Sequence, residues 1–120
     1  MLVSFLLRAI LIFMIDIPWL YFTSATAGEM FRKIQGHKIT LKLVPSIIIY
    51  LVLSYLTTIP KTAESAFLLG LAVYAVYDFT NLATLTHYTT QFAILDSLWG
   101  GVLFTLVFYA MKRFPQIKGS

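Results

Sequence analysis

Three aspartates lie inside apolar stretches of this chain, where a carboxylate is costly to keep. Asp16 occurs in IDIPWL, Asp78 in VYDFTNLATL and Asp96 in LDSLWGG. An ionised aspartate at the centre of a membrane helix costs about 2.5–3.5 kcal/mol, so such residues face the protein interior or a water-filled cavity. Carboxylates in that position can hold a cation or proton, or accept hydrogen bonds that join helices. We therefore asked which elements must position them.

The composition is that of a membrane protein. Of 120 residues, 59% are apolar and 12% are charged, whereas soluble domains are about 45–50% apolar. Crossing the bilayer takes about 20 apolar residues in a helix, and four apolar runs approach or exceed that length. These runs are residues 2–22, 43–59, 63–85 and 92–111. The sequence predicts one all-α domain over residues 1–120, an integral membrane four-helix bundle.

The link between the first two helices is the longest connection. Its segment 29–34 is predicted to form a short amphipathic helix on the membrane surface, bounded by Gly28 and Gly36. Each cation near an anionic lipid surface contributes about 1 kcal/mol of attraction, which makes this link a candidate headgroup site; a solvated positive loop is the simpler alternative. The cations are Arg32, Lys33, Lys38 and Lys42.

Four helices place both termini on one side, side A, and the first and third links on the other, side B. Side A carries four cations, Lys61, Lys112, Arg113 and Lys118, and the first link on side B also carries four. The positive-inside rule is tied, and Arg8, one snorkelling residue near side A, does not set the orientation. The net charge of +4 forms no basic stripe, which argues against a nucleic acid partner.

The three aspartates are predicted to lie at one depth. With a rise of about 1.5 Å per residue, Asp16 and Asp78 are each roughly 20 Å from side A. Asp96 comes shortly after the start of the fourth helix and lies roughly 6–8 Å below side B by the same rise. We therefore expect one acidic layer, built from three helices, in the half of the bundle near side B.

Polar and aromatic residues share the helix faces of these acids. Residues three or four apart are neighbours on a helix, which brings Asn81 to Asp78 and a tryptophan to each of the other two acids. The predicted binding pocket comprises Asp16, Asp78, Asn81, Asp96, Trp99, Tyr50 and Trp19. Trp19 also has the position of an interfacial anchor. Gly100 and Gly101 should allow close approach of a neighbouring helix.

Several functions are compatible with this layer. We favour a pocket that binds or passes a small polar solute, a proton or a cation, and a purely structural hydrogen-bonded layer is the plain alternative. In the pocket we expect Asp78 to be the central group, with Asn81 orienting it and Asp16 and Asp96 completing the layer. A second alternative is an accessory subunit of a larger membrane complex or a homo-oligomer, which would expose aromatic residues such as Phe104, Phe108 and Tyr109.

An enzyme acting on a lipid is a third alternative, in which two carboxylates act as acid and base with His87 beside them. No motif identifies a nucleophile. His37 and His87 lack metal-ligand spacing and the chain has no cysteine, so neither a metal nor a cofactor is expected.

The residues around the acids also carry a family resemblance. The run Y-D-x-T-N-x-A-T-L at 77–85, D-x-x-W-G at 96–100, and the acid and tryptophan of the first helix match a pattern that covers nearly the whole chain. In these residues the chain resembles a family of small four-helix predicted membrane proteins classed as a domain of unknown function. The resemblance implies a multi-pass location in the membrane and supplies no activity, substrate or cofactor.

Overall fold

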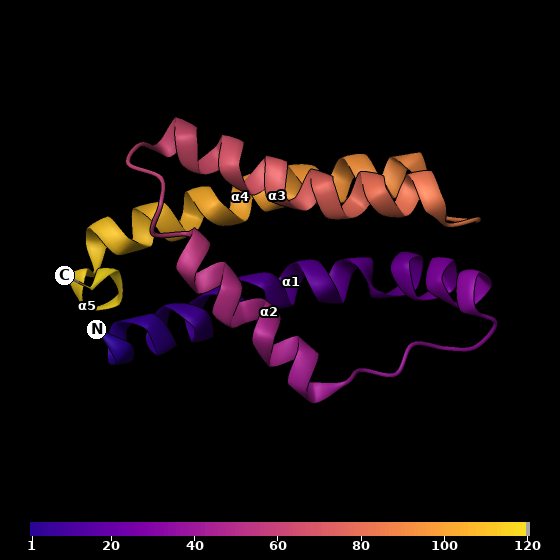
Figure 1. Ribbon diagram of the computed structural model, residues 1–120, viewed down its shortest axis with the longest axis horizontal. Coiled ribbons are helices and arrows are strands. Elements are labelled where there is room, and N and C mark those ends of the chain that lie inside the picture. The colour runs from indigo at the N-terminus through magenta and orange to yellow at the C-terminus, as the bar shows by residue number, and fades with distance from the viewer. Residues whose placement is uncertain (120) are drawn as a thin grey trace.

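The chain folds into four apolar helices and one short terminal turn. A computed structural model describes residues 1–119. It contains α1 (Leu2–Gln35), α2 (Leu43–Leu56), α3 (Ala63–Thr84), α4 (Thr90–Arg113) and α5 (Pro115–Lys118), as Figure 1 shows. α1, α3 and α4 are long and apolar enough to cross a membrane, and α2 is a shorter apolar helix. The all-α membrane bundle and the multi-pass location are confirmed.

The two ends of the bundle are those expected from an even number of helices. Both termini lie together at one end, and the α1–α2 and α3–α4 connections lie at the opposite end (Figure 1). The end with the termini is side A and the other is side B.

The predicted interfacial helix is not a separate element. Residues 29–34 form the last turns of α1, which ends where Gly36 adopts a left-handed φ of 83°. The polar stretch after Phe22 contains no proline, and its hydroxyls bond to carbonyls one turn back, as from Thr23 Oγ1 to the Trp19 carbonyl at 2.7 Å. Gly28 costs only about 1 kcal/mol inside a helix, too little to end it.

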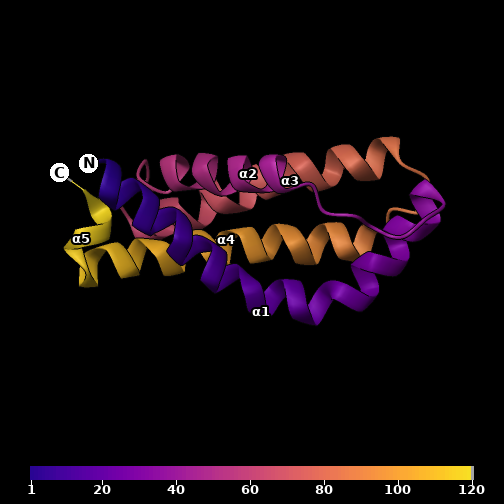
Figure 2. The same cartoon turned by 90° about the horizontal axis from the view of Figure 1, so that it is seen from below.

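α1 is bent along its length (Figure 2). Pro18 lies inside the helix, where it lacks the backbone donor and its ring crowds the preceding turn. The bend separates the first half of α1, which packs with α2, from the turns that approach side B.

α2 is shorter than the predicted run 43–59. It has 14 residues, about 21 Å by the rise of a helix, against about 30 Å of hydrocarbon. Residues 37–42, which precede it, have no regular secondary structure and are exposed. Figure 1 shows α2 in the half of the bundle near the termini. The half near side B therefore has three helices, with an extended segment in place of a fourth.

α3 and α4 pack backbone against backbone. A Cβ added to Gly70 would strike the carbonyl oxygen of Gly100, and one added to Gly100 would strike the carbonyl of Gly70 and the ring of Tyr74. A Cβ on Gly101 would meet the Phe67 ring. The close approach predicted for Gly100 and Gly101 is thus present, with α3 as the neighbour.

The main core lies on the side A half of this pair. Its buried members are Ile12, Leu53, Ala66, Leu103, Phe104, Val107 and Met111. Phe104 was expected on an outer aromatic surface and is instead 1% exposed, because glycine at position 70 leaves room for its ring against α3. Tyr109 is 53% exposed, as that expectation required.

Arg8 joins α1 to two helix ends. Its side chain is buried, with Nε donating to the Ser54 carbonyl at 2.8 Å and Nη1 to the Ile117 carbonyl at 2.6 Å. The last carbonyls of a helix lack intrahelical donors and attract cations. Arg8 therefore turns inward and does not snorkel to the lipid surface, because α2 and α5 both end beside it.

The glycine contact makes a testable prediction. Gly70→Ala should lower the free energy of unfolding by about 1–3 kcal/mol, because the added methyl group would force α3 away from α4. Gly28→Ala is the matched control, since no atom lies within 4 Å of a Cβ there. It should leave stability unchanged or raise it by about 0.5–1 kcal/mol. Unfolding in mixed micelles, followed by circular dichroism, measures both; equal stability of the two variants would contradict the close contact.

A second prediction concerns Arg8. Arg8→Met removes the donor to the Ser54 and Ile117 carbonyls and should cost about 1–3 kcal/mol. Amide hydrogen exchange over residues 115–119 should accelerate, because α5 loses its attachment to α1. Arg113→Met, at an exposed arginine, should change neither quantity. Unaltered exchange in the Arg8 variant would show that α5 is held by other contacts.

Candidate functional site

Two aspartates and two tryptophans link α1 to α4 crosswise. Trp19 Nε1 donates to Asp96 Oδ1 at 2.8 Å, and Trp99 Nε1 donates to Asp16 Oδ1 at 2.8 Å. The two indole rings stack, with centroids 5.4 Å apart and planes 7° from parallel. Each helix carries Asp-x-x-Trp on one face, and the helices run in opposite directions, so each acid meets the tryptophan of the other. We call these four residues the crossed Asp–Trp pair.

Tyr50 connects α2 to Asp16. Its hydroxyl donates to Asp16 Oδ2 at 2.7 Å, and its ring packs edge-on against Phe13 of α1. Both oxygens of Asp16 thus accept hydrogen bonds, one from α2 and one from α4. A hydrogen bond inside a protein contributes about 0.5–1.5 kcal/mol net. Because the two donors belong to α2 and α4, Asp16 joins three helices.

Asp78 of α3 is the third acid and lies next to Asp96. It is 0% exposed and accepts a hydrogen bond from the Tyr88 hydroxyl at 2.6 Å, and Ser97 Oγ is 3.5 Å from its other oxygen. Its carboxyl group also lies beside that of Asp96. The three acids expected at one depth are therefore in one cluster, built from α1, α3 and α4.

The sequence did not single out Tyr88 or Ser97 as partners of Asp78. Tyr88 follows His87 in the turn between α3 and α4, where His87 adopts a left-handed φ of 75°. Burial and the hydrogen bond to Asp78 raise the pKa of Tyr88, which keeps its hydroxyl a donor. Asn81 was expected to orient Asp78, but it lies beside Tyr77 and Tyr88 and is not a hydrogen-bond partner of Asp78 within residues 1–119.

A cavity of about 610 Å³ lies between the α1–α2 side and the α3–α4 side of the bundle. Asp16 and Asp96 line it, whereas Asp78 does not. Its aromatic wall comprises Trp19, Phe31, Tyr50, Tyr74, Tyr77 and Phe92. The lining also includes Ile39 and Leu41 of the extended segment, together with residues of α2, so the cavity extends from α2 towards side B.

The rim of this cavity is exposed and mostly apolar. Leu41, Ile49 and Tyr77 are 87%, 55% and 54% exposed, and all three belong to the lining. The cavity therefore opens at the surface of the protein. Because the rim carries isoleucine and leucine, this opening suits contact with lipid.

Asp96 has one oxygen that no N–H or hydroxyl group reaches. Oδ1 accepts from Trp19, and Oδ2 accepts from no N–H or hydroxyl group of the residues that the structure describes, although the carboxyl group of Asp78 lies within hydrogen-bonding reach of the Asp96 carboxyl group. Asp96 is 8% exposed and belongs to the lining, so its side chain borders the cavity.

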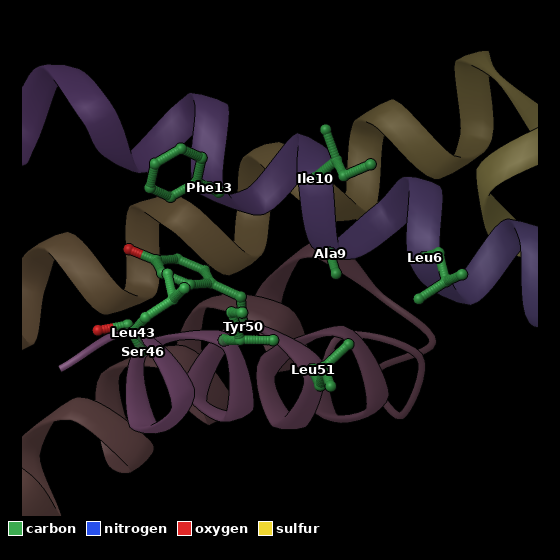
Figure 3. A pocket seen from close by; sticks show the side chains of 9 residues that line it. Leu6, Ala9, Ile10, Phe13, Leu43, Ser46, Tyr50 and Leu51 are labelled. Carbon is green, nitrogen blue, oxygen red and sulfur yellow. The ribbon is translucent and has the colours of Figure 1, made fainter.

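A second hollow, of about 490 Å³, lies between α1 and α2 (Figure 3). Leu6 and Phe13 of α1 and Leu43 and Leu51 of α2 belong to its lining and are labelled in Figure 3. Its polar members are Ser46 and Tyr50, and both hydroxyls already donate, to the Lys42 carbonyl and to Asp16. This groove has no charged side chain in its lining, unlike the cavity lined by Asp16 and Asp96.

The basic link has the surface position expected of it. Arg32, Lys33, Lys38 and Lys42 are exposed, and Arg32 pairs with Glu29 at 3.1 Å. A role for them at lipid headgroups stays a prediction.

No group of three or more acids and histidines suited to a metal ion occurs in residues 1–119, and the acids are approached by N–H and O–H donors, which compete with a metal for the same oxygens.

Comparison with known proteins identifies a family model and nothing more. The model described as "Predicted membrane protein (DUF2177)" matches residues 1–111, which include the crossed Asp–Trp pair, Asp78 and the whole cavity lining. Neither a curated protein nor a solved structure matches the chain.

The contact between Tyr88 and Asp78 predicts a difference between two tyrosines. Tyr88→Phe should lower the free energy of unfolding by about 1–3 kcal/mol, because a buried carboxyl oxygen loses its donor. Tyr109→Phe should have no measurable effect, since that side chain is 53% exposed. The mixed-micelle unfolding assay compares them. Equal stabilities would mean that another group replaces the Tyr88 hydroxyl.

Proposed function

This chain belongs to that family of predicted membrane proteins, and on this premise we propose that it binds a small polar solute, a proton or a cation in the cavity lined by Asp16 and Asp96. The observation that carries the proposal is that Asp96 lines the cavity with one oxygen, Oδ2, that no N–H or hydroxyl group reaches, whereas Oδ1 accepts from Trp19 at 2.8 Å. A carboxylate with unused acceptor capacity, in a space with an apolar wall, attracts a positive or hydrogen-bonding partner strongly because little water competes.

Each acid has a separate part in this proposal. Asp96 contacts the solute. Asp16, held by Tyr50 and Trp99, supplies a fixed negative charge across the cavity. Asp78 is enclosed and supports Asp96 from behind, which moves the central role from Asp78, as the sequence suggested, to Asp96.

Binding is favoured over passage through the protein. Towards side A, Ile12, Leu103 and Phe104 are each at most 1% exposed and fill the space between the helices. A solute held at Asp96 would meet this core before reaching the far side. The exposed cations of the α1–α2 link, near the side B end, are proposed to hold anionic lipid headgroups there.

One observation favours a second candidate, an accessory subunit of a larger membrane complex. Both oxygens of Asp16 and one oxygen each of Asp78 and Asp96 accept a hydrogen bond from an N–H or hydroxyl group inside the protein. Acids satisfied in this way can serve as helix joints alone. Extraction in a mild detergent followed by native mass spectrometry separates the candidates, since a subunit would run in a particle that contains other chains.

The proposed function predicts which carboxyl group reacts with an apolar reagent. Dicyclohexylcarbodiimide, applied to native membranes, should modify Asp96 and leave Asp78 unmodified, because Asp96 borders the cavity and Asp78 does not. Peptide mass spectrometry locates the adduct. Asp96→Asn provides the reference without the reactive group.

Protection by solutes completes this test. Sodium, magnesium, methylammonium and glycine, added singly, are probes of the solute class, and binding by any of them should slow the modification of Asp96. Modification of Asp78 in preference to Asp96 would contradict the proposed geometry. Ready modification of Asp96 that no polar or cationic probe slows, including the amine described below, would favour the subunit alternative.

A further inference from the structure

We infer that the ligand of this cavity is a monovalent organic cation with an apolar body, such as an aralkyl amine. The inference rests on the proposed function and narrows it to one chemical class. Four properties of the cavity support it: the sign of its charges, the chemistry of its wall, its size and its rim.

The charged groups of the lining are both acids. Asp16 and Asp96 belong to it, and no lysine or arginine does. The nearest buried cation, Arg8, is committed to carbonyls near side A. An anion would therefore meet two carboxylates without a counter-charge, whereas a cation would be attracted by both.

The wall suits an organic cation better than a metal ion. Hard cations such as Ca²⁺ take 6–8 oxygen ligands, and Mg²⁺ prefers six in an octahedron. Here both oxygens of Asp16 and one of Asp96 already accept hydrogen bonds. Aromatic rings attract ammonium groups through their faces, and six aromatic side chains line this cavity. An ammonium group needs few acceptors and gains from these rings.

Size and rim point to the same class. A volume of about 610 Å³ lies within the range of about 300–1,000 Å³ typical of small-molecule sites and is far larger than a bare ion requires. The rim residues Leu41 and Ile49 are exposed and apolar, so the entrance suits contact with lipid. An amphiphilic amine that partitions into the bilayer can enter there, with its body against the aromatic wall and its ammonium group at Asp96.

The tryptophans allow a direct measurement. The chain has two, and both belong to the crossed Asp–Trp pair, so the intrinsic fluorescence of the whole protein reports on the cavity. Full-length protein in nanodiscs of zwitterionic lipid is titrated with 2-phenylethylamine and with its neutral analogue 2-phenylethanol. The amine should produce a saturable change at a concentration at least about tenfold lower than the alcohol, because only the amine pairs with a carboxylate.

Matched variants assign the effect to the cavity. Asp96→Asn keeps an oxygen for Trp19 and removes the charge, and it should weaken amine binding at least about tenfold without changing the affinity for the alcohol. Glu64→Gln, at an exposed acid near side A, should leave both affinities unchanged. A circular dichroism melt of each variant establishes that it is folded, and Asp96→Glu should restore part of the amine affinity.

Three other results would overturn the inference. Equal affinity for amine and alcohol would show that the apolar body alone determines binding. Binding of sodium, magnesium or glycine that depends on Asp96, without binding of the amine, would reject the amine class and leave the proposed function in place. Failure of every probe to bind, with the protein folded, would reject both.

Discussion

The reciprocal hydrogen bonds between Asp16, Trp19, Asp96 and Trp99 hold the two halves of this bundle together. α3 and α4 are joined by glycine contacts, and α1 and α2 by Tyr50 and Arg8, but α1 and α4 form the seam between those pairs. In a bilayer, apolar side chains gain little by leaving lipid for protein, so helix association relies on close packing and on polar contacts. The stacked indoles supply the first and their N–H groups the second.

The cavity follows from the same arrangement. The bend at Pro18 carries the end of α1 away from its first half, and α2 is too short to fill the side B half of the bundle. The gap is bordered by the seam on one side and by the extended segment on the other. The cavity therefore has acidic side chains in its wall, because residues that join α1 to α4 also line it.

The three aspartates divide between structural and available roles. Asp16 accepts hydrogen bonds at both oxygens, from α2 and α4, and Asp78 accepts one from Tyr88 of the α3–α4 turn, so both acids join elements of the fold. Asp96 accepts from Trp19 and also lines the cavity. In the proposed function, a ligand at Asp96 would act on an acid that also orients Trp19. The same cluster would then serve the proposed binding function and a structural one.

Much of this architecture could be predicted from the sequence, because span length, helix rise and the cost of buried charge are local properties. They determined the apolar helices, the side on which the termini lie and the common depth of the three acids. Helix ends were less predictable: α1 continues through a polar stretch, and α2 stops early. The partner of each acid depended on the rotation of every helix about its axis, which only packing decides. Hence the exchange of tryptophans between Asp16 and Asp96, the approach of Tyr88 to Asp78, and the position of Asp96 in the cavity wall came from the tertiary structure alone.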